Sequence, residues 1–155
     1  MTVHYPACGL KYVYLRNGYI LRHEGGIAIR HPDSLHEAIA VGIITRSRPL
    51  RGQEVRFLRA ALDLSQARLA RALQTTRVTV ARWEGAAGEP IPGIADTALR
   101  LFYAAKRNKY KLARQVCRLL GELGTRAESV AIEDRLVLRQ TPHGWEPDSE
   151  LDRVA

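Results

Sequence analysis

Cysteines, long apolar runs and, over much of the chain, acidic residues are scarce in this sequence, and the first two shortages each exclude a class of protein. Only two cysteines, Cys8 and Cys117, occur in 155 residues, so neither a disulfide framework nor a four-thiolate zinc site can form. The densest apolar stretch, Ala38–Ile44, is too short to cross a bilayer, and we expect no membrane contact. The first residues lack the basic segment and apolar block of a secretion signal, so we expect a cytoplasmic protein.

The excess of basic over acidic residues is concentrated in the middle of the chain. Residues 46–118 carry 16 basic and 5 acidic side chains, against 4 and 3 in residues 1–45 and 4 and 8 in residues 119–155. Such a basic block attracts polyanions because binding releases their condensed counterions, which makes nucleic acid the leading partner. The other interpretation is a charged surface that only keeps the protein soluble.

Strand and turn signals dominate the first third. Two apolar runs, Tyr12–Leu15 and Tyr19–Leu21, flank Asn17-Gly18, and this dipeptide predicts a tight hairpin between them. Ile27–Arg30 predicts a third strand, and a helix is expected from Leu35 to Arg46. We therefore expect a small α+β unit over residues 1–48.

Residues 46–52 have no periodicity and predict a linker. From Gln53 the apolar period becomes helical and predicts five short helices up to residue 123. Their apolar stripes contain Val55, Leu58 and Leu62; Leu69, Ala70 and Leu73; Val80 and Trp83; Ala95, Ala98, Leu99, Phe102 and Ala105; and Ala113, Val116, Cys117 and Leu120. Cys117 is therefore expected in the core. Residues 124–155 predict a hairpin and a solvated acidic tail. The expected fold is mainly α, with the small N-terminal α+β unit and this C-terminal hairpin.

Two capping residues indicate a helix-turn-helix between residues 64 and 84. Ser65 and Thr76 are preferred N-cap residues, and only Gln74 and Thr75 lie between Leu73 and the second cap. A turn this short makes the two helices meet at a steep angle.

The outward face of the second helix of this motif has the chemistry of base readout. With Val80 and Trp83 turned inward, the helix presents small and cationic side chains: Arg77, Val78, Ala81 and Arg82, flanked by Thr79. Arginine can fork onto guanine, and the Val78 and Thr79 methyl groups can pack on thymine. Gln66 and Thr76 are expected to contact phosphates. A solvated helical hairpin is the other interpretation.

These residues also carry a resemblance to a known family. Leu64-Ser65-Gln66, Leu69-Ala70 and Thr79–Glu84 resemble the lambda-repressor/Cro-like (XRE) helix-turn-helix over about residues 52–101. The resemblance implies a five-helix DNA-binding domain over residues 49–123 that reads operator DNA with the helix beginning at Arg77. It also implies a homodimer on an inverted repeat, with recognition helices roughly 34 Å apart, that represses transcription by covering a promoter.

Two positions depart from the pattern of this family. Asp63 and Gln74 stand before the second helix and inside the turn, where the family usually has glycine. Asp tolerates left-handed backbone, whereas Gln74 in that conformation is expected to cost about 1 kcal/mol.

A longer resemblance is to MqsA-type antitoxins and their relatives. It rests on Tyr5, Cys8-Gly9-Leu10, Tyr14-Leu15, Asn17-Gly18-Tyr19, Leu35-His36, Ala38-Ile39 and residues 91–96. It implies, as the alternative function, an antitoxin that binds a toxin protein and represses its own operon. The cysteine pairs that bind zinc in that N-terminal module are absent, and we expect neither a metal nor another cofactor.

Other side chains carry weaker signals. His4, Cys8, His23, His31 and His36 are zinc-ligand types, but their irregular spacing favours surface or packing roles. No pattern of an activated nucleophile accompanies Cys8, so we expect no enzyme. A basic cluster of Lys106, Arg107, Lys109, Lys111 and Arg114 either contacts phosphates or is a solvated face. RNA binding is disfavoured because no aromatic stacking motif accompanies the basic residues.

Overall fold

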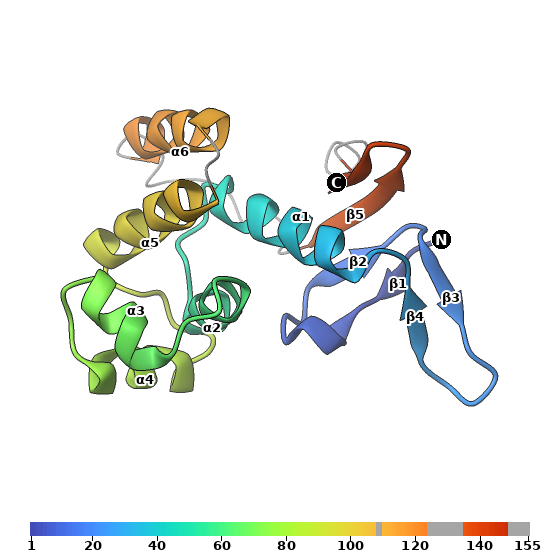
Figure 1. Ribbon diagram of the computed structural model, residues 1–155, viewed down its shortest axis with the longest axis horizontal. Coiled ribbons are helices and arrows are strands. Elements are labelled where there is room, and N and C mark those ends of the chain that lie inside the picture. Colours follow the sequence, from blue (N-terminus) through green and yellow to red (C-terminus); the bar gives the residue numbers. More distant parts are fainter. Residues whose placement is uncertain (108–109, 124–134, 149–155) are drawn as a thin grey trace. The chain divides into compact units, whose positions relative to one another are not determined.

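The computed structural model describes residues 1–107, 110–123 and 135–148. The chain divides into two units, one formed by Met1–Gly42 with Ala131–Ala155 and the other by Ile43–Val130. Within the described ranges there are six α-helices and two small β-sheets (Figure 1). The fold is therefore mixed α and β, which confirms in part the expected combination of helices with small strand-containing segments. No helix of these ranges has the length and apolarity needed to span a membrane.

The first unit contains a four-stranded sheet made from both ends of the chain. Its strands, in the order β1-β2-β5-β6, are β1 (Val3–His4), β2 (Val13–Leu15), β5 (Leu136–Thr141) and β6 (Gly144–Pro147). The expected C-terminal hairpin is present as β5 and β6, but β5 pairs in parallel with β2. The hairpin therefore completes the N-terminal unit, and the second unit is inserted between the two parts of the first.

One long helix, α1 (Pro32–Ile44), packs against this sheet. Leu35 and Ile39 on the helix are fully buried. A Cβ added to Gly42 would lie 3.0 Å from Leu136 Cδ1, so the helix backbone approaches β5 closely at this point. A short 3-10 turn, η1 (Pro6–Cys8), connects β1 toward β2.

The hairpin predicted around Asn17-Gly18 is wrong. β3 (Tyr19–Leu21) pairs with β4 (Ile27–Ile29) instead of with β2. The Gln140 backbone N–H donates to Asn17 Oδ1 at 2.6 Å, and a Cβ on Gly18, whose φ is 75°, would come within 2.5 Å of the Trp145 ring. The dipeptide therefore connects the two sheets. Its geometry is set by contacts with Gln140 and Trp145, which are distant in sequence, and not by a hairpin between β2 and β3.

The second unit contains five helices in its described part. They are α2 (Gly52–Ala61), α3 (Gln66–Ala72), α4 (Arg77–Gly85), α5 (Gly93–Lys106) and α6 (Tyr110–Leu123). Val55, Leu58, Leu69 and Val80 are fully buried, as the apolar periods of the first three helices predict.

The buried faces of the last two helices differ from the prediction. In α5, Ala105 is exposed, whereas Asp96, Arg100 and Tyr103 are buried beside Leu99. In α6, Leu112 and Val116 are buried, and the placement of Cys117 in the core is wrong because its side chain is exposed. Ala105 and Cys117 were misplaced because a stripe of small residues does not show which of two neighbouring helix faces is buried. Asp96 and Arg100 were missed because an ion pair whose polar groups are hydrogen-bonded to each other and to backbone can occupy the core.

The buried pair Asp96 and Arg100 holds the chain that leads into α2. The two side chains form an ion pair, and the Leu50 N–H donates to Asp96 Oδ2 at 2.7 Å. The Arg100 guanidinium donates to three backbone carbonyls, those of Ile44 at 3.0 Å, Arg46 at 2.5 Å and Arg48 at 2.6 Å. Residues 44–50, which precede α2, are thus a fixed part of the unit and not a loose linker.

Removal of this guanidinium should strongly destabilise the protein. We expect Arg100→Met to lower the free energy of unfolding by about 3–5 kcal/mol, because Asp96 would remain buried without its counterion. As a control, Arg107→Met removes an exposed guanidinium that donates to the Ala61 carbonyl at 2.6 Å, and it should cost no more than about 1.5 kcal/mol. Urea denaturation measures both, and equal losses would contradict the structural role given to Arg100.

Candidate nucleic-acid interface

Both predicted N-caps of the helix-turn-helix are confirmed. Ser65 Oγ accepts the Arg68 N–H at 3.2 Å at the start of α3, and Thr76 Oγ1 accepts the Thr79 N–H at 3.2 Å at the start of α4. Each cap satisfies one backbone donor that the first turn of a helix leaves without an intrahelical acceptor. The caps therefore set the residues at which the two helices begin.

The left-handed backbone expected at the two departures from glycine is also confirmed. Asp63 and Gln74 both have φ near 54°. After Gln74 the chain reverses, and the Thr75 N–H donates to the Ala70 carbonyl at 2.9 Å. This closes the turn between α3 and α4 within the few residues that the sequence provides.

An ion pair anchors the inner side of α4. Glu84, whose side chain is only 7% exposed, receives hydrogen bonds from Arg59 Nε at 2.6 Å and Nη2 at 3.0 Å. Arg59 Nη1 also donates to the Leu64 carbonyl at 2.9 Å. Since Arg59 is on α2, this forked contact ties α2, the start of α3 and α4 together, and Val80 is fully buried one turn before it.

Gln66 belongs to the same network. Its Nε2 donates to Glu84 Oε2 at 3.0 Å, so the predicted phosphate ligand has its amide directed at a carboxylate inside the protein. An amide nitrogen carries two hydrogens, and one remains for another acceptor.

The network shifts the acid–base behaviour of both charged partners. Burial alone would raise the pKa of the Glu84 carboxyl, but the hydrogen bonds from Arg59 and Gln66 and the charges of Arg59 and Arg56 outweigh it and hold the pKa below its ordinary value. The hydrogen bond to Glu84 raises the pKa of Arg59. Both groups are therefore charged at neutral pH.

The outer side of α4 is exposed as the sequence predicts. Arg77 and Arg82 are exposed, and Val78 keeps 73% of its surface open to solvent. Thr79 and Ala81 are half-buried at the edges of this face. Thr76 is exposed, and its Oγ1 lies 2.9 Å from Thr79 Oγ1.

Charge is divided cleanly between the two sides of the motif. From Ser65 to Gly85 the exposed charged residues are all arginines, namely Arg68, Arg71, Arg77 and Arg82. Glu84 is the only acid of this segment, and it is the residue buried against Arg59. Sequence reasoning missed this pair because Arg59 and Glu84 are 25 positions apart and no local pattern links them.

The start of α2 lies directly against the end of α4. The Gly52 N–H donates to the Glu89 carbonyl at 3.2 Å and the Gln53 N–H to the Ala87 carbonyl at 3.0 Å. A Cβ on Gly52 would stand 1.8 Å from the Trp83 carbonyl oxygen. Glycine is thus required here by the close approach of two backbones.

The remaining sequence candidates are not gathered into a site. Cys8 Sγ donates to the Tyr5 carbonyl at 3.3 Å, and burial raises the pKa of its thiol. In residues 1–107, 110–123 and 135–148, no group of three or more His, Cys, Asp or Glu side chains could hold a metal ion. Of the basic cluster, Lys106, Arg107, Lys111 and Arg114 are exposed, and Lys109 lies outside the described residues.

No protein-family model, curated protein or solved structure matches this chain.

Substitution of Gly52 should disrupt the junction between α2 and α4. We expect Gly52→Ala to cost about 3 kcal/mol, because the methyl group can be accommodated only by moving backbone. Gly85→Ala is the matched control, since a Cβ there meets nothing within 4 Å, and it should leave stability unchanged or raise it by up to about 1 kcal/mol. Thermal unfolding distinguishes the two, and a neutral Gly52→Ala would contradict the close approach.

The Glu84 network should make stability depend on pH. Because the folded state lowers the pKa of Glu84 below the ordinary 4.5, its contribution is present above that value and is lost as the pH falls through the folded pKa. Glu84→Gln should cost about 1–2 kcal/mol at pH 7, since solvent partly screens the pair. The difference from wild type should shrink below pH 4.5 in urea titrations. A difference that is constant from pH 7 to pH 3 would contradict this account.

Proposed function

We propose that this protein is a sequence-specific DNA-binding regulator of transcription that acts as a repressor by placing α4 in the major groove. The observation that carries the proposal is the outer side of α4, which exposes arginines and an apolar side chain while the only acid of the motif is buried against Arg59. A carboxylate on that side would repel phosphates. The division of charge therefore favours a polyanionic partner.

The individual side chains suit base readout. Arg77 and Arg82 can each fork onto guanine O6 and N7, and the exposed Val78 can pack on a thymine methyl group. Val78 is 73% exposed, so its methyl groups are accessible to a partner. Thr79 and Ala81 are small enough to let the helix approach the bases.

Phosphate contacts would position α4 in the groove. The Thr76 hydroxyl lies at the N-terminus of α4, where the helix dipole favours an anion. Gln66 retains one amide hydrogen for the same purpose, and Arg68 and Arg71 on α3 are exposed. These contacts set register and orientation without reading sequence.

The proposed assembly is a homodimer on an inverted repeat. Two copies of α4 would then occupy successive major grooves roughly 34 Å apart, and the bound protein would cover a promoter. Footprinting of the purified protein on the DNA upstream of its own gene tests this directly. A symmetric protected site is expected, and binding without any protected site would contradict it. The antitoxin alternative would use the same α4 face, and a neighbouring small toxin-like reading frame would favour it.

One arginine provides the sharpest test of base readout. If Arg82 forks onto a guanine, Arg82→Ala should cost about 1–3 kcal/mol of binding free energy and relax specificity at one operator position. Arg22→Ala, which removes an exposed arginine from the other unit, is the control and should change neither. Competition binding with operator variants measures both effects. Unchanged discrimination in Arg82→Ala would remove Arg82 from the readout set.

A further inference from the structure

A second cationic face lies on α6, on the far side of α5 from α3 and α4 (Figure 1). Lys111, Arg114 and Arg118 are exposed, whereas Leu112 and Val116 are buried. At about 100° per residue, the three cations fall within about 60° of one another and opposite the two buried residues. They form a continuous stripe that points away from the body of the unit.

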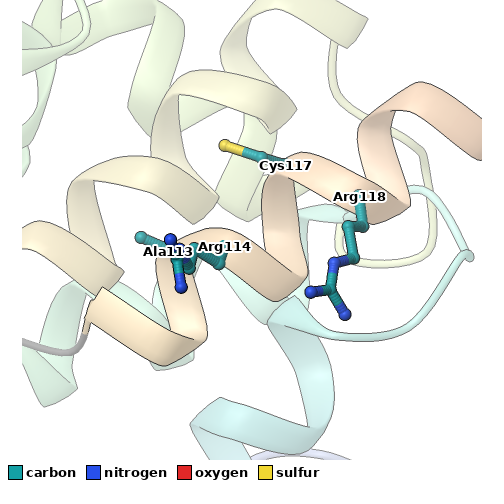
Figure 2. A pocket seen from close by; sticks show the side chains of 4 residues that line it. All are labelled: Ala113, Arg114, Cys117 and Arg118. Atoms are coloured by element: carbon teal, nitrogen blue, oxygen red, sulfur yellow. The ribbon is translucent and has the colours of Figure 1, made fainter.

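The stripe borders a hollow in the surface. This shallow, open hollow is lined by Ala113, Arg114, Cys117 and Arg118, all on α6 (Figure 2). Two of its four lining residues carry guanidinium groups. An anionic group that enters the hollow therefore meets positive charge together with apolar helix surface.

The spacing of these cations is unfavourable for the helix itself. Lys111 and Arg114 are three positions apart and Arg114 and Arg118 four, and like charges at both spacings destabilise a helix. The first turn of α6 contains no acid, so Lys111 also opposes the helix dipole. The acid of this helix, Glu122, comes in its last turn, four positions after Arg118, so the uncompensated repulsion lies between Lys111 and Arg114. A polyanionic partner would relieve this repulsion.

We propose that the face formed by Lys111, Arg114 and Arg118 binds the phosphate backbone of a second DNA duplex, so that one molecule bridges two DNA segments. Because α5 lies between α6 and the helix-turn-helix, a straight duplex seated on α4 does not extend to this face. Guanidinium groups fork onto phosphate oxygens and do so without reading sequence. The choice of DNA as the polyanion rests on the proposed function; an acidic protein is the other partner that such a face would fit.

Two matched pairs of substitutions separate the faces. Arg77→Gln with Arg82→Gln disables α4, and Arg114→Gln with Arg118→Gln disables α6, each with the loss of two exposed arginines. The full-length protein is bound to an immobilised duplex that carries the upstream DNA, and a labelled duplex of unrelated sequence is then added. Wild type should retain the labelled duplex. The variant with both α6 substitutions should retain at least tenfold less labelled duplex than wild type, while its discrimination among upstream sequences is unchanged.

The α4 pair provides the second arm. It should lose sequence discrimination but keep weak binding to any duplex, and adding the α6 pair to it should reduce the slope of log affinity against log salt by about two, one for each phosphate contact. The α6 pair should unfold at the same urea concentration as wild type or a higher one, because a like-charge pair is removed. Arg22→Gln is the control for loss of an exposed charge.

Two outcomes would overturn the inference. The first is that the variant with both α6 substitutions still captures the labelled duplex, because the two α4 helices of a dimer would then bridge the two duplexes. The second is equal residual DNA binding with and without the α6 substitutions in the α4 background, which would leave an acidic protein as the partner of this face. If the upstream DNA shows no protected site but residual binding depends on α6, the proposed function and the bridging both fail, and only the binding of phosphate by α6 stands.

Discussion

The buried contact of Arg100 and Asp96 with the backbone of residues 44–50 is the constraint on which the second unit depends. Carbonyl groups in that segment accept the guanidinium hydrogens, and Asp96 accepts the Leu50 N–H. Burial of two charges costs several kcal/mol for each ion, and this arrangement offsets the cost because the hydrogen-bonding capacity of both groups is largely used. The segment is thereby held against α5.

That segment then positions the helix-turn-helix. The Leu50 carbonyl accepts the Ile91 N–H at 2.9 Å, and Arg51 forms a β-bridge with Pro90. Gly52 follows and lies against the carbonyl end of α4. Arg59, two turns later on α2, reaches Glu84 and closes the frame around α4. The exposed face of α4 is therefore presented by a chain of contacts that begins at a buried ion pair on α5.

The electrostatic character of the surface follows from where the acids are placed. Glu84 and Asp96 each pair with an arginine inside the unit, so each pair is neutral and neither carboxylate lies on the cationic surface. The arginines of α3 and α4 and the cations of α6 remain at the surface on different sides of α5. The net charge counted from the sequence gives only the sum over residues 46–118. It does not show that these two acids are buried while the cations lie at the surface.

Several elements show how far local signals reach. The two N-caps and the exposure of Val78 were predictable because each depends on residues within one or two turns. The left-handed backbone at Asp63 and Gln74 was expected from the resemblance to the XRE pattern, which has glycine at these positions. Asn17-Gly18 was misassigned because the partners that decide its geometry, Gln140 and Trp145, come from the other end of the chain. Cys117 was misplaced because small residues flank the true apolar stripe of α6.

Local sequence signals specify where the helices of the helix-turn-helix begin and which side of α4 is cationic, since caps and helical period act over a few residues. Three features came from tertiary contacts alone: the C-terminal hairpin completes the N-terminal sheet, Gln66 donates to Glu84 inside the motif, and Arg100 belongs to the core. Those outcomes rest on hydrogen bonds between residues far apart in sequence, and such pairings leave no periodic trace in the chain.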